Sequence, residues 1–182
     1  MEAETKTEND NNDDNKGKPE QDGFEICEVG QPIINNTAKT FKSYRKERWF
    51  DTKERMQFIN ITAEIEQMLK ESGITDGIIL ISPMHITASV IIQDDNKSLH
   101  ADFAQYLETL VPNDESMTMG LYNHNSWGDA NGDSHIKRQL FKREVWSSIT
   151  NGRLDFSDNE QIIYAEFDGR RKKRVLIKIL GY

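Results

Sequence analysis

The last third of the chain, from Glu144 onward, is a succession of short stretches in which apolar and polar residues alternate. The stretch EVWSSIT ends at Asn151-Gly152, a pair typical of a two-residue hairpin turn, and RLDF follows it. EQIIYAEF then runs to a second turn at Asp168-Gly169, and RRKKRVLIKIL closes the chain. Because side chains alternate between the two faces of a strand, this period favours strands over helices. The pattern predicts an antiparallel meander whose last strand keeps its basic side chains in solvent.

Strands and amphipathic helices are mixed further upstream. The aromatic and charged residues of segment 46–62 suit an outer strand, whereas the continuous apolar run 76–82 suits a buried one. Segments 61–73 and 98–110 carry apolar residues at helical spacing. We expect Thr62 and Ser98 to cap these two helices. Since strands outnumber helices, the sequence predicts an α+β domain built on an antiparallel sheet, with two or three helices.

The beginning of the chain differs from the rest in composition. Residues 1–23 carry eight Asp or Glu and three Lys, a net charge of −5 out of −8 for the whole chain. They have no apolar period, so they bury too little apolar surface to offset the entropy of ordering. We therefore expect residues 1–40 to form a disordered acidic leader and linker, and residues 41–182 to form one domain.

The composition also excludes several classes of protein. We see no apolar stretch of the kind found in signal peptides or membrane spans, and the single cysteine, Cys27, forms no internal disulfide. The basic run Arg170–Arg174 stands in an acidic chain without a recognised nucleic-acid-binding motif, so we assign it to a solvated edge. We expect a soluble cytoplasmic protein that binds neither nucleic acid nor membranes.

Candidate functional residues begin with a polar face on an otherwise apolar strand. In HITASVIIQ, residues 85–93, His85, Thr87 and Ser89 alternate with apolar residues. On a strand, these three side chains would project together. A half-buried strand rarely carries three polar residues in this way unless that face borders a cleft, an interface or water.

Two further histidines lie at the ends of the polar loop NHNSWGDANGDSH. His124 lies near the beginning of this loop, and His135 lies in the first turn of a helix predicted for residues 134–141. Asp133 is a suitable N-cap for that helix, with Ile136 and Leu140 facing inward. The free N–H groups and the dipole at a helix N-terminus favour an anion close to His135.

The chemistry of these residues leaves two uses open. If His85, His124 and His135 meet, they form a three-histidine site with an open position for a divalent metal, zinc or magnesium. The same imidazoles with Lys137 and a helix N-terminus also suit a phosphate group. The spacing from His124 to His135 matches no standard metal motif. The simplest alternative is a loop histidine and a partly exposed helix histidine with no shared role.

Two other residues have less specific surroundings. His100 lies near the start of a surface helix, where we expect it to be solvated and apart from the other histidines. Glu166 lies on a strand beside apolar neighbours, so a buried position would require a partner for its charge.

Four separate motifs, HITAS, SHIKRQ, GRLDF and EFDGRRKKRVLIKILG, occur in an order and at a spacing that closely resemble the YjbQ family. Members of this family are often named secondary thiamine-phosphate synthases. The resemblance runs from about Phe41 to the end of the chain. It implies a compact α+β fold with an antiparallel β-sandwich core, a homotrimer, and polar pockets near subunit contacts.

The family motifs coincide with the residues grouped above. The resemblance implies a metal or phosphates held by His85, His124 and His135; phosphate contacts from Thr87, Ser89, Lys137 and Arg171; and a general base at Glu166 or Asp133. One motif departs from the family pattern, since its Gly-Thr-Trp-Gln box is replaced by Ser157, Asp158, Asn159 and Glu160. If this box shapes the pocket, the substrate or the activity has changed.

The activity that the resemblance implies joins a pyrimidine diphosphate to a thiazole phosphate and releases pyrophosphate. This reaction needs cations or a metal for the leaving group and a water-poor pocket for the carbocation-like pyrimidine. A metal-dependent hydrolase of a small phosphorylated metabolite is a second hypothesis. A non-catalytic trimeric metabolite-binding protein is a third.

The acidic leader generates a first prediction. Deleting residues 1–23 should leave the melting temperature and the oligomeric state unchanged, because this segment has no apolar period with which to pack. Differential scanning calorimetry and light scattering on the full and shortened chains would measure both quantities. A fall of several degrees in the melting temperature would show that the leader packs on the domain.

Overall fold

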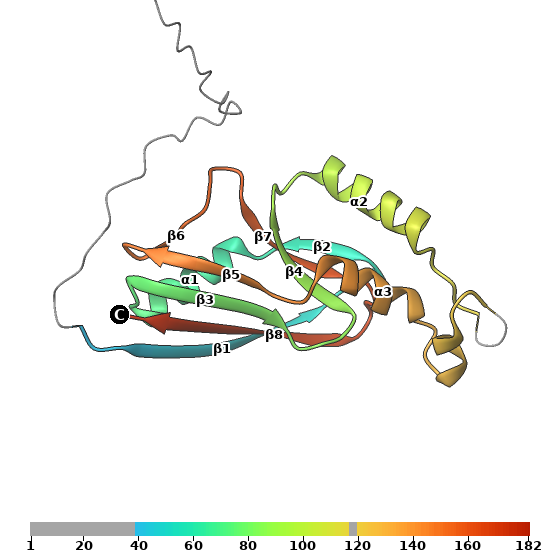
Figure 1. The fold of residues 1–182 in the computed structure, drawn as a ribbon, viewed down its shortest axis with the longest axis horizontal. Coiled ribbons are helices and arrows are strands. Elements are labelled where there is room, and N and C mark those ends of the chain that lie inside the picture. Colours follow the sequence, from blue (N-terminus) through green and yellow to red (C-terminus); the bar gives the residue numbers. More distant parts are fainter. Residues whose placement is uncertain (1–38, 117–119) are drawn as a thin grey trace, which may run out of the picture. The chain divides into compact units, whose positions relative to one another are not determined.

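A computed structural model describes residues 39–116 and 120–182, which form two antiparallel sheets with helices around them (Figure 1). The predicted leader, residues 1–40, lies almost entirely outside the described residues. In chain order the elements are β1 (Lys42–Asp51), β2 (Gln57–Asn60), α1 (Thr62–Ser72), β3 (Asp76–Pro83), β4 (Ala88–Gln93), α2 (Lys97–Leu110), the 3-10 helix η1 (Asn123–Trp127), α3 (Gly132–Phe141), β5 (Val145–Thr150), β6 (Arg153–Leu154), β7 (Gln161–Glu166) and β8 (Lys172–Gly181). None of the described helices is long and apolar enough to cross a membrane.

The larger sheet has five strands in the order β1-β8-β3-β5-β6, and the smaller sheet has three in the order β2-β7-β4. The outer strand predicted in segment 46–62 corresponds to parts of β1 and β2, each of which is an edge strand. The buried run 76–82 forms β3, which pairs with β8 on one side and β5 on the other. The α+β fold with an antiparallel sandwich core is therefore confirmed.

The predicted C-terminal meander is only partly correct. The hairpin between β5 and β6 forms at Asn151-Gly152, where both residues have positive φ angles of 52° and 75°, as its two-residue turn requires. However, β7 joins the smaller sheet and β8 returns to the larger one. The turn at Asp168-Gly169 is therefore a crossing between sheets. Each strand would show the same alternation of apolar and polar residues in a single meander and in two separate sheets. The local pattern therefore does not distinguish these two topologies.

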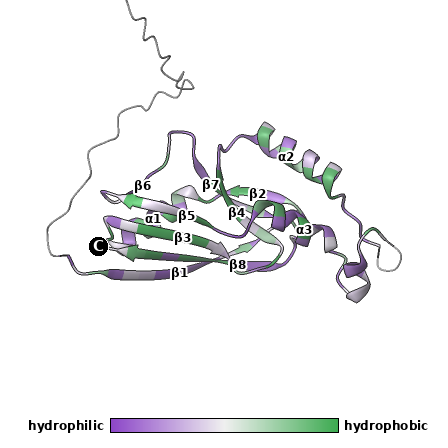
Figure 2. Ribbon diagram, viewed as in Figure 1, coloured by the Kyte–Doolittle hydropathy of each residue, from purple (hydrophilic) through white to green (hydrophobic). Residues whose placement is uncertain are grey.

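The main core lies between the two sheets. Val175, Ile177 and Ile179 of β8 are fully buried and belong to one apolar cluster with Ile162 and Tyr164 of β7. Each such apolar side chain contributes about 1.5–3 kcal/mol when fully buried. Figure 2 shows β3 and β8 as mainly hydrophobic ribbons and β1 as largely hydrophilic, as expected for central and edge strands.

The helices α1 and α2 form as predicted, but their caps differ from the prediction. Helix α1 buries the apolar stripe that contains Ile65 and Leu69 and ends at Gly73 in the left-handed conformation. The side chain of Asn60, and not that of Thr62, accepts a hydrogen bond at the start of α1, from the Thr62 N–H. At α2 the cap is Asn96, one residue before the helix.

The third helix buries its polar face. Gly132, Asp133, Ser134 and Lys137 are buried in α3, whereas Ile136 and Leu140, predicted to face inward, are 42% and 51% exposed. Helical periodicity gives two opposite faces but does not say which one packs on the sheets. Here buried ion pairs hold the polar face inward, and the apolar face is left in solvent.

The exposed apolar face of α3 would gain free energy if another subunit covered it, so we propose it as a contact in the homotrimer that the family resemblance implies. We predict a solution mass three times the 21.1 kDa of one chain. Ile136→Asp combined with Leu140→Asp should shift the protein toward monomers, whereas Gln139→Asp on the same helix should not. Light scattering at micromolar concentration measures the mass, and a monomeric wild-type protein would contradict the prediction.

Candidate functional site

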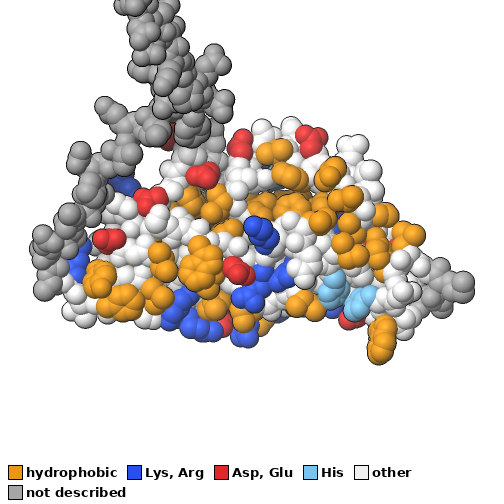
Figure 3. Space-filling model, viewed as in Figure 1, with side chains coloured by type: hydrophobic (Ala, Val, Ile, Leu, Met, Phe, Trp, Pro, Cys, Tyr) orange, Lys and Arg blue, Asp and Glu red, His pale blue; other side chains and the backbone are white. Residues whose placement is uncertain are grey.

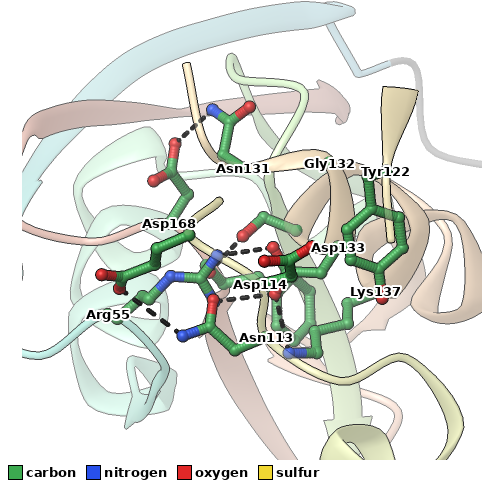
Figure 4. A network of polar contacts seen from close by, with 12 residues as sticks. Arg55, Asn113, Asp114, Tyr122, Asn131, Gly132, Asp133, Lys137 and Asp168 are labelled. Carbon is green, nitrogen blue, oxygen red and sulfur yellow. Dashed lines mark hydrogen bonds and ion pairs between the residues drawn. The ribbon is translucent and has the colours of Figure 1, made fainter. Parts of the chain in front are cut away.

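A buried ion pair anchors the start of α3 to the loop between β1 and β2 (Figure 4). Asp133 accepts hydrogen bonds from the Arg55 guanidinium at 2.7 and 2.5 Å and from Lys137 Nζ at 2.9 Å. Burial tends to raise the pKa of Asp133, but hydrogen bonds from the two cations outweigh it and lower this pKa. Asp133 therefore does not cap α3 with its side chain. The predicted phosphate contact from Lys137 is also wrong, because its side chain is fully buried in this ion pair.

A second buried ion pair lies where the chain crosses from β7 to β8. Glu166 and Lys173 are 1% and 2% exposed and form this pair. Lys173 Nζ also donates to Thr87 Oγ1 at 2.8 Å and to the Asp168 carbonyl at 2.7 Å, and the Tyr164 hydroxyl donates to Glu166 at 2.6 Å. Glu166 thus has the partner that its burial requires. Enclosure of this kind argues against general-base roles for Glu166 and, equally, for Asp133.

The crossing between the sheets is clamped by the β1–β2 loop. The Gly169 N–H donates to the Arg55 carbonyl at 2.8 Å, and the Arg170 N–H donates to the Thr52 carbonyl at 3.0 Å. A Cβ atom on Gly169 would lie 1.9 Å from the Glu54 carbonyl oxygen, so only glycine permits this approach. The clamp fixes the position of Asp168, the residue before this glycine.

Asn131 connects Asp168 to His124. Asn131 Nδ2 donates to Asp168 Oδ2 at 2.9 Å, and Asn131 Oδ1 lies 3.2 Å from His124 Nε2. Because a carboxylate can only accept, the amide nitrogen must face Asp168 and the amide oxygen must face His124. His124 Nε2 is therefore the hydrogen-bond donor, and Nδ1 is the ring nitrogen that remains for a ligand.

His124 and His135 form a pair at the surface. Their ring centroids are 4.5 Å apart, and His124 is exposed while His135 is half-buried. Figure 3 shows histidine side chains at the surface on the side of the molecule where α3 lies. Burial and then the His124 ring lower the pKa of His135, and Asp168 partly offsets them. Two of the three predicted histidines thus come together, and His135 is neutral at pH 7.

His85 lies in a turn and not on a strand, because β4 begins only at Ala88. Its Nδ1 atom lies 2.9 Å from Oγ1 of Thr87, which is fully buried. Ser89 is also buried, and its hydroxyl donates to the Lys142 carbonyl at 2.5 Å. The predicted polar strand face is therefore wrong, and neither hydroxyl is open to a phosphate.

The basic run does not lie on a solvated edge, since β8 is hydrogen-bonded to β1 and β3. Lys173 is buried, but Arg170, Arg171 and Lys172 remain exposed. Arg171 Nε lies 3.7 Å from Asp168 Oδ2. Asp168 therefore connects Arg171 to the histidine pair, and the Arg171 side chain is 45% exposed. Its predicted contact with a phosphate stays a prediction.

The described part of one chain does not supply a complete set of metal ligands. No group of three His, Cys, Asp or Glu side chains in residues 39–116 and 120–182 is arranged to hold a metal ion. The histidine pair offers two ligands, whereas a catalytic zinc usually has three from the protein. His100, predicted to be solvated, instead packs against Phe58 with ring centroids 5.3 Å apart and only 13% of its side chain exposed.

The altered family box lies elsewhere in the fold. Ser157, Asp158 and Glu160 line a cavity of about 620 Å³ together with residues of α1 and the β5–β6 hairpin, and none of its lining residues is a histidine. The change from Gly-Thr-Trp-Gln therefore alters this cavity and leaves the residues around the histidine pair as they are.

Arg55, Asn131 and Lys173 are site residues that the sequence-based prediction missed. The burial of Lys173 could have been predicted from the sequence. Lys173 lies two residues before Val175, so on a strand it faces the same side as the buried Val175 and Ile177. Arg55 and Asn131 lie in polar loops, and their partners are distant in sequence, so no local pattern indicates them.

Fold and site together define an α+β protein with a core between two sheets. A pair of histidines lies close to the segment that connects the sheets, which carries the exposed Arg170, Arg171 and Lys172. Residues 46–182 match the family described as UPF0047 protein YjbQ-like, and the chain belongs to that family. A UPF0047 protein of Methanothermobacter thermautotrophicus is 32% identical over 138 residues, which cover 76% of this chain and 92% of that relative. The UPF0047 protein YugU of Bacillus subtilis is 28% identical over 71% of this chain and 94% of its own length.

Solved structures show the same fold. A YbjQ-like protein of unknown function from Sulfolobus solfataricus superposes with a TM-score of 0.72 at 24% identity, covering 79% of this chain and all of that one. An uncharacterised YjbQ/UPF0047 protein from Clostridium acetobutylicum has a TM-score of 0.66 at 30% identity over 74% of this chain and 98% of its own.

The buried carboxylate of Asp133 gives a stability prediction. Asp133→Asn should lower the free energy of unfolding by about 3–5 kcal/mol, because it leaves Arg55 without its ion-pair partner and Lys137 with only the more exposed Glu108. The matched control is Glu64→Gln, which breaks the exposed Arg48–Glu64 pair and should cost less than about 1 kcal/mol. Urea denaturation measures both values. Equal losses would contradict the importance assigned to the buried pair.

Proposed function

We propose that this protein is an enzyme that binds the phosphate or diphosphate group of a small metabolite between its histidine pair and Arg171. The observation that carries the proposal is the position of Asp168, which contacts both Arg171 and Asn131. Through Asn131 it is connected to His124. An arginine beside imidazole groups is a suitable environment for phosphate oxygens.

The specific reaction that we propose is the one implied by the family resemblance. A thiazole phosphate nitrogen forms a bond to the pyrimidine methylene carbon, and the bond from that carbon to the diphosphate oxygen breaks, so the electron pair leaves with pyrophosphate. Charge accumulates on the departing oxygens, where preorganised cations stabilise the transition state most. Arg171 supplies a fixed positive charge, and the exposed Arg170 and Lys172 add to the local potential.

The two paired histidines have different roles in this proposal. His135 is half-buried and neutral, and it contacts the phosphate through a ring N–H. His124 donates its Nε2–H to Asn131, and its Nδ1 atom faces the substrate and helps to orient it. Asn131 and Asp168 are positioning residues, since they orient the His124 ring.

The other two hypotheses have less support. A metal-dependent hydrolase would need a third metal ligand, which the described residues of one chain do not provide. A non-catalytic binding protein would not require a histidine lone pair oriented by a hydrogen-bonded amide. For these reasons we favour the transferase.

The test is incubation of the full-length protein with the pyrimidine diphosphate and the thiazole phosphate, followed by chromatographic measurement of thiamine phosphate. His124→Ala and Arg171→Gln should each lower kcat/KM by about 100-fold or more, as loss of a substrate-orienting group or of a charge-stabilising donor does. His100→Ala and Arg48→Gln, which change a histidine and an arginine outside the site, should change it less than about twofold. Absence of thiamine phosphate with the wild-type protein would refute this reaction.

A further inference from the structure

A buried cation is connected to the His85 ring through one hydroxyl group. Lys173 Nζ contacts the Glu166 carboxylate, the Asp168 carbonyl and the Thr87 hydroxyl. A protonated lysine has three N–H donors and no lone pair, so these three acceptors use all of its hydrogen-bonding capacity. Glu166 accepts further bonds from the Tyr164 hydroxyl and from two backbone N–H groups, and it forms a salt bridge with Lys173. Lys173 must therefore donate to Thr87 Oγ1.

This donation determines where the proton of Thr87 goes. Because Oγ1 already accepts from Lys173, its own hydrogen is available for His85 Nδ1 at 2.9 Å. The Thr87 backbone N–H also points to His85 Nδ1, at 3.4 Å. With two donors facing it, Nδ1 must present its lone pair, and the proton of the neutral ring is therefore on Nε2.

The surroundings of His85 keep the ring neutral. Burial lowers its pKa, the nearby Lys173 lowers it further, and Glu166 and Asp168 offset only part of this effect. The remaining polar group of this half-buried side chain is thus the Nε2–H. A metal ligand needs a ring lone pair, but the only one, at Nδ1, is already used by Thr87.

We propose that Lys173, acting through Thr87, holds His85 as the Nε2–H tautomer, so that His85 donates a hydrogen bond to a phosphate oxygen of the substrate and does not bind a metal. The identity of that oxygen rests on the proposed function. His85 is linked to Asp168 through Thr87 and Lys173, and Asp168 is linked to His124 through Asn131. Both parts of the site therefore meet at the crossing between the sheets. A neutral imidazole is an effective donor to an oxygen that becomes more negative during a reaction.

The tautomer can be measured by NMR on the full chain with ¹⁵N-labelled histidine rings, at neutral pH. We expect His85 to show a protonated Nε2 and an unprotonated Nδ1. Thr87→Val, which removes the hydroxyl at constant shape, should convert this signal to a mixture of tautomers, whereas Thr87→Ser should preserve it. The His100 signals serve as an internal control in both variants. A wild-type His85 with a protonated Nδ1 would overturn the proposal.

The contact with substrate is tested with inorganic pyrophosphate as the probe. Adding it should shift the His85 Nε2–H signal and leave the tautomer unchanged, and Thr87→Val should weaken this response at least fivefold. An unperturbed His85 in the wild-type protein would overturn the contact. If thiamine phosphate is not formed but pyrophosphate perturbs His85, the proposed reaction fails and this inference stands. If the reaction proceeds with His85 unperturbed, only this inference fails.

Discussion

The buried ion pair between Glu166 and Lys173 is the interaction on which the rest of the structure depends. Both side chains lie at the crossing from the small sheet to the large one, where a charge without a partner would be very costly. The lysine also binds the Asp168 carbonyl and the Thr87 hydroxyl. One ammonium group therefore holds together the end of β7, the start of β8 and the turn before β4.

The same crossing connects the stability of the fold to the chemistry of the site. The β1–β2 loop clamps the turn from one side, and Arg55 of that loop also neutralises Asp133 in α3. Helix α3 therefore has to turn its charged face inward, which places His135 beside the polar turn and leaves Ile136 in solvent. The exposed apolar surface of this protein is thus a consequence of the ion pairs that build its site.

The rings of His124 and His85 have different hydrogen-bonding partners. Asn131 Oδ1 accepts a hydrogen bond from His124 Nε2–H, whereas the Thr87 hydroxyl donates to His85 Nδ1. The two rings consequently present different nitrogens to a ligand, Nδ1 in His124 and Nε2–H in His85. Such an arrangement can orient a substrate that carries several polar groups.

The sequence by itself determined the local elements of this protein. Period-two alternation located β5, β7 and β8, and a continuous apolar run located β3. Helical spacing located α1 and α2, and Asn151-Gly152 located the β5–β6 hairpin. Each of these patterns depends only on neighbouring residues. Only the tertiary structure decided that β7 and β8 belong to different sheets, that α3 buries Lys137 and exposes Leu140, and that Thr87 serves a buried lysine. These outcomes depend on hydrogen bonds and ion pairs between residues far apart in the chain. The energy of these contacts depends on how deeply the partners are buried, and the residues next to them in the sequence do not indicate that burial.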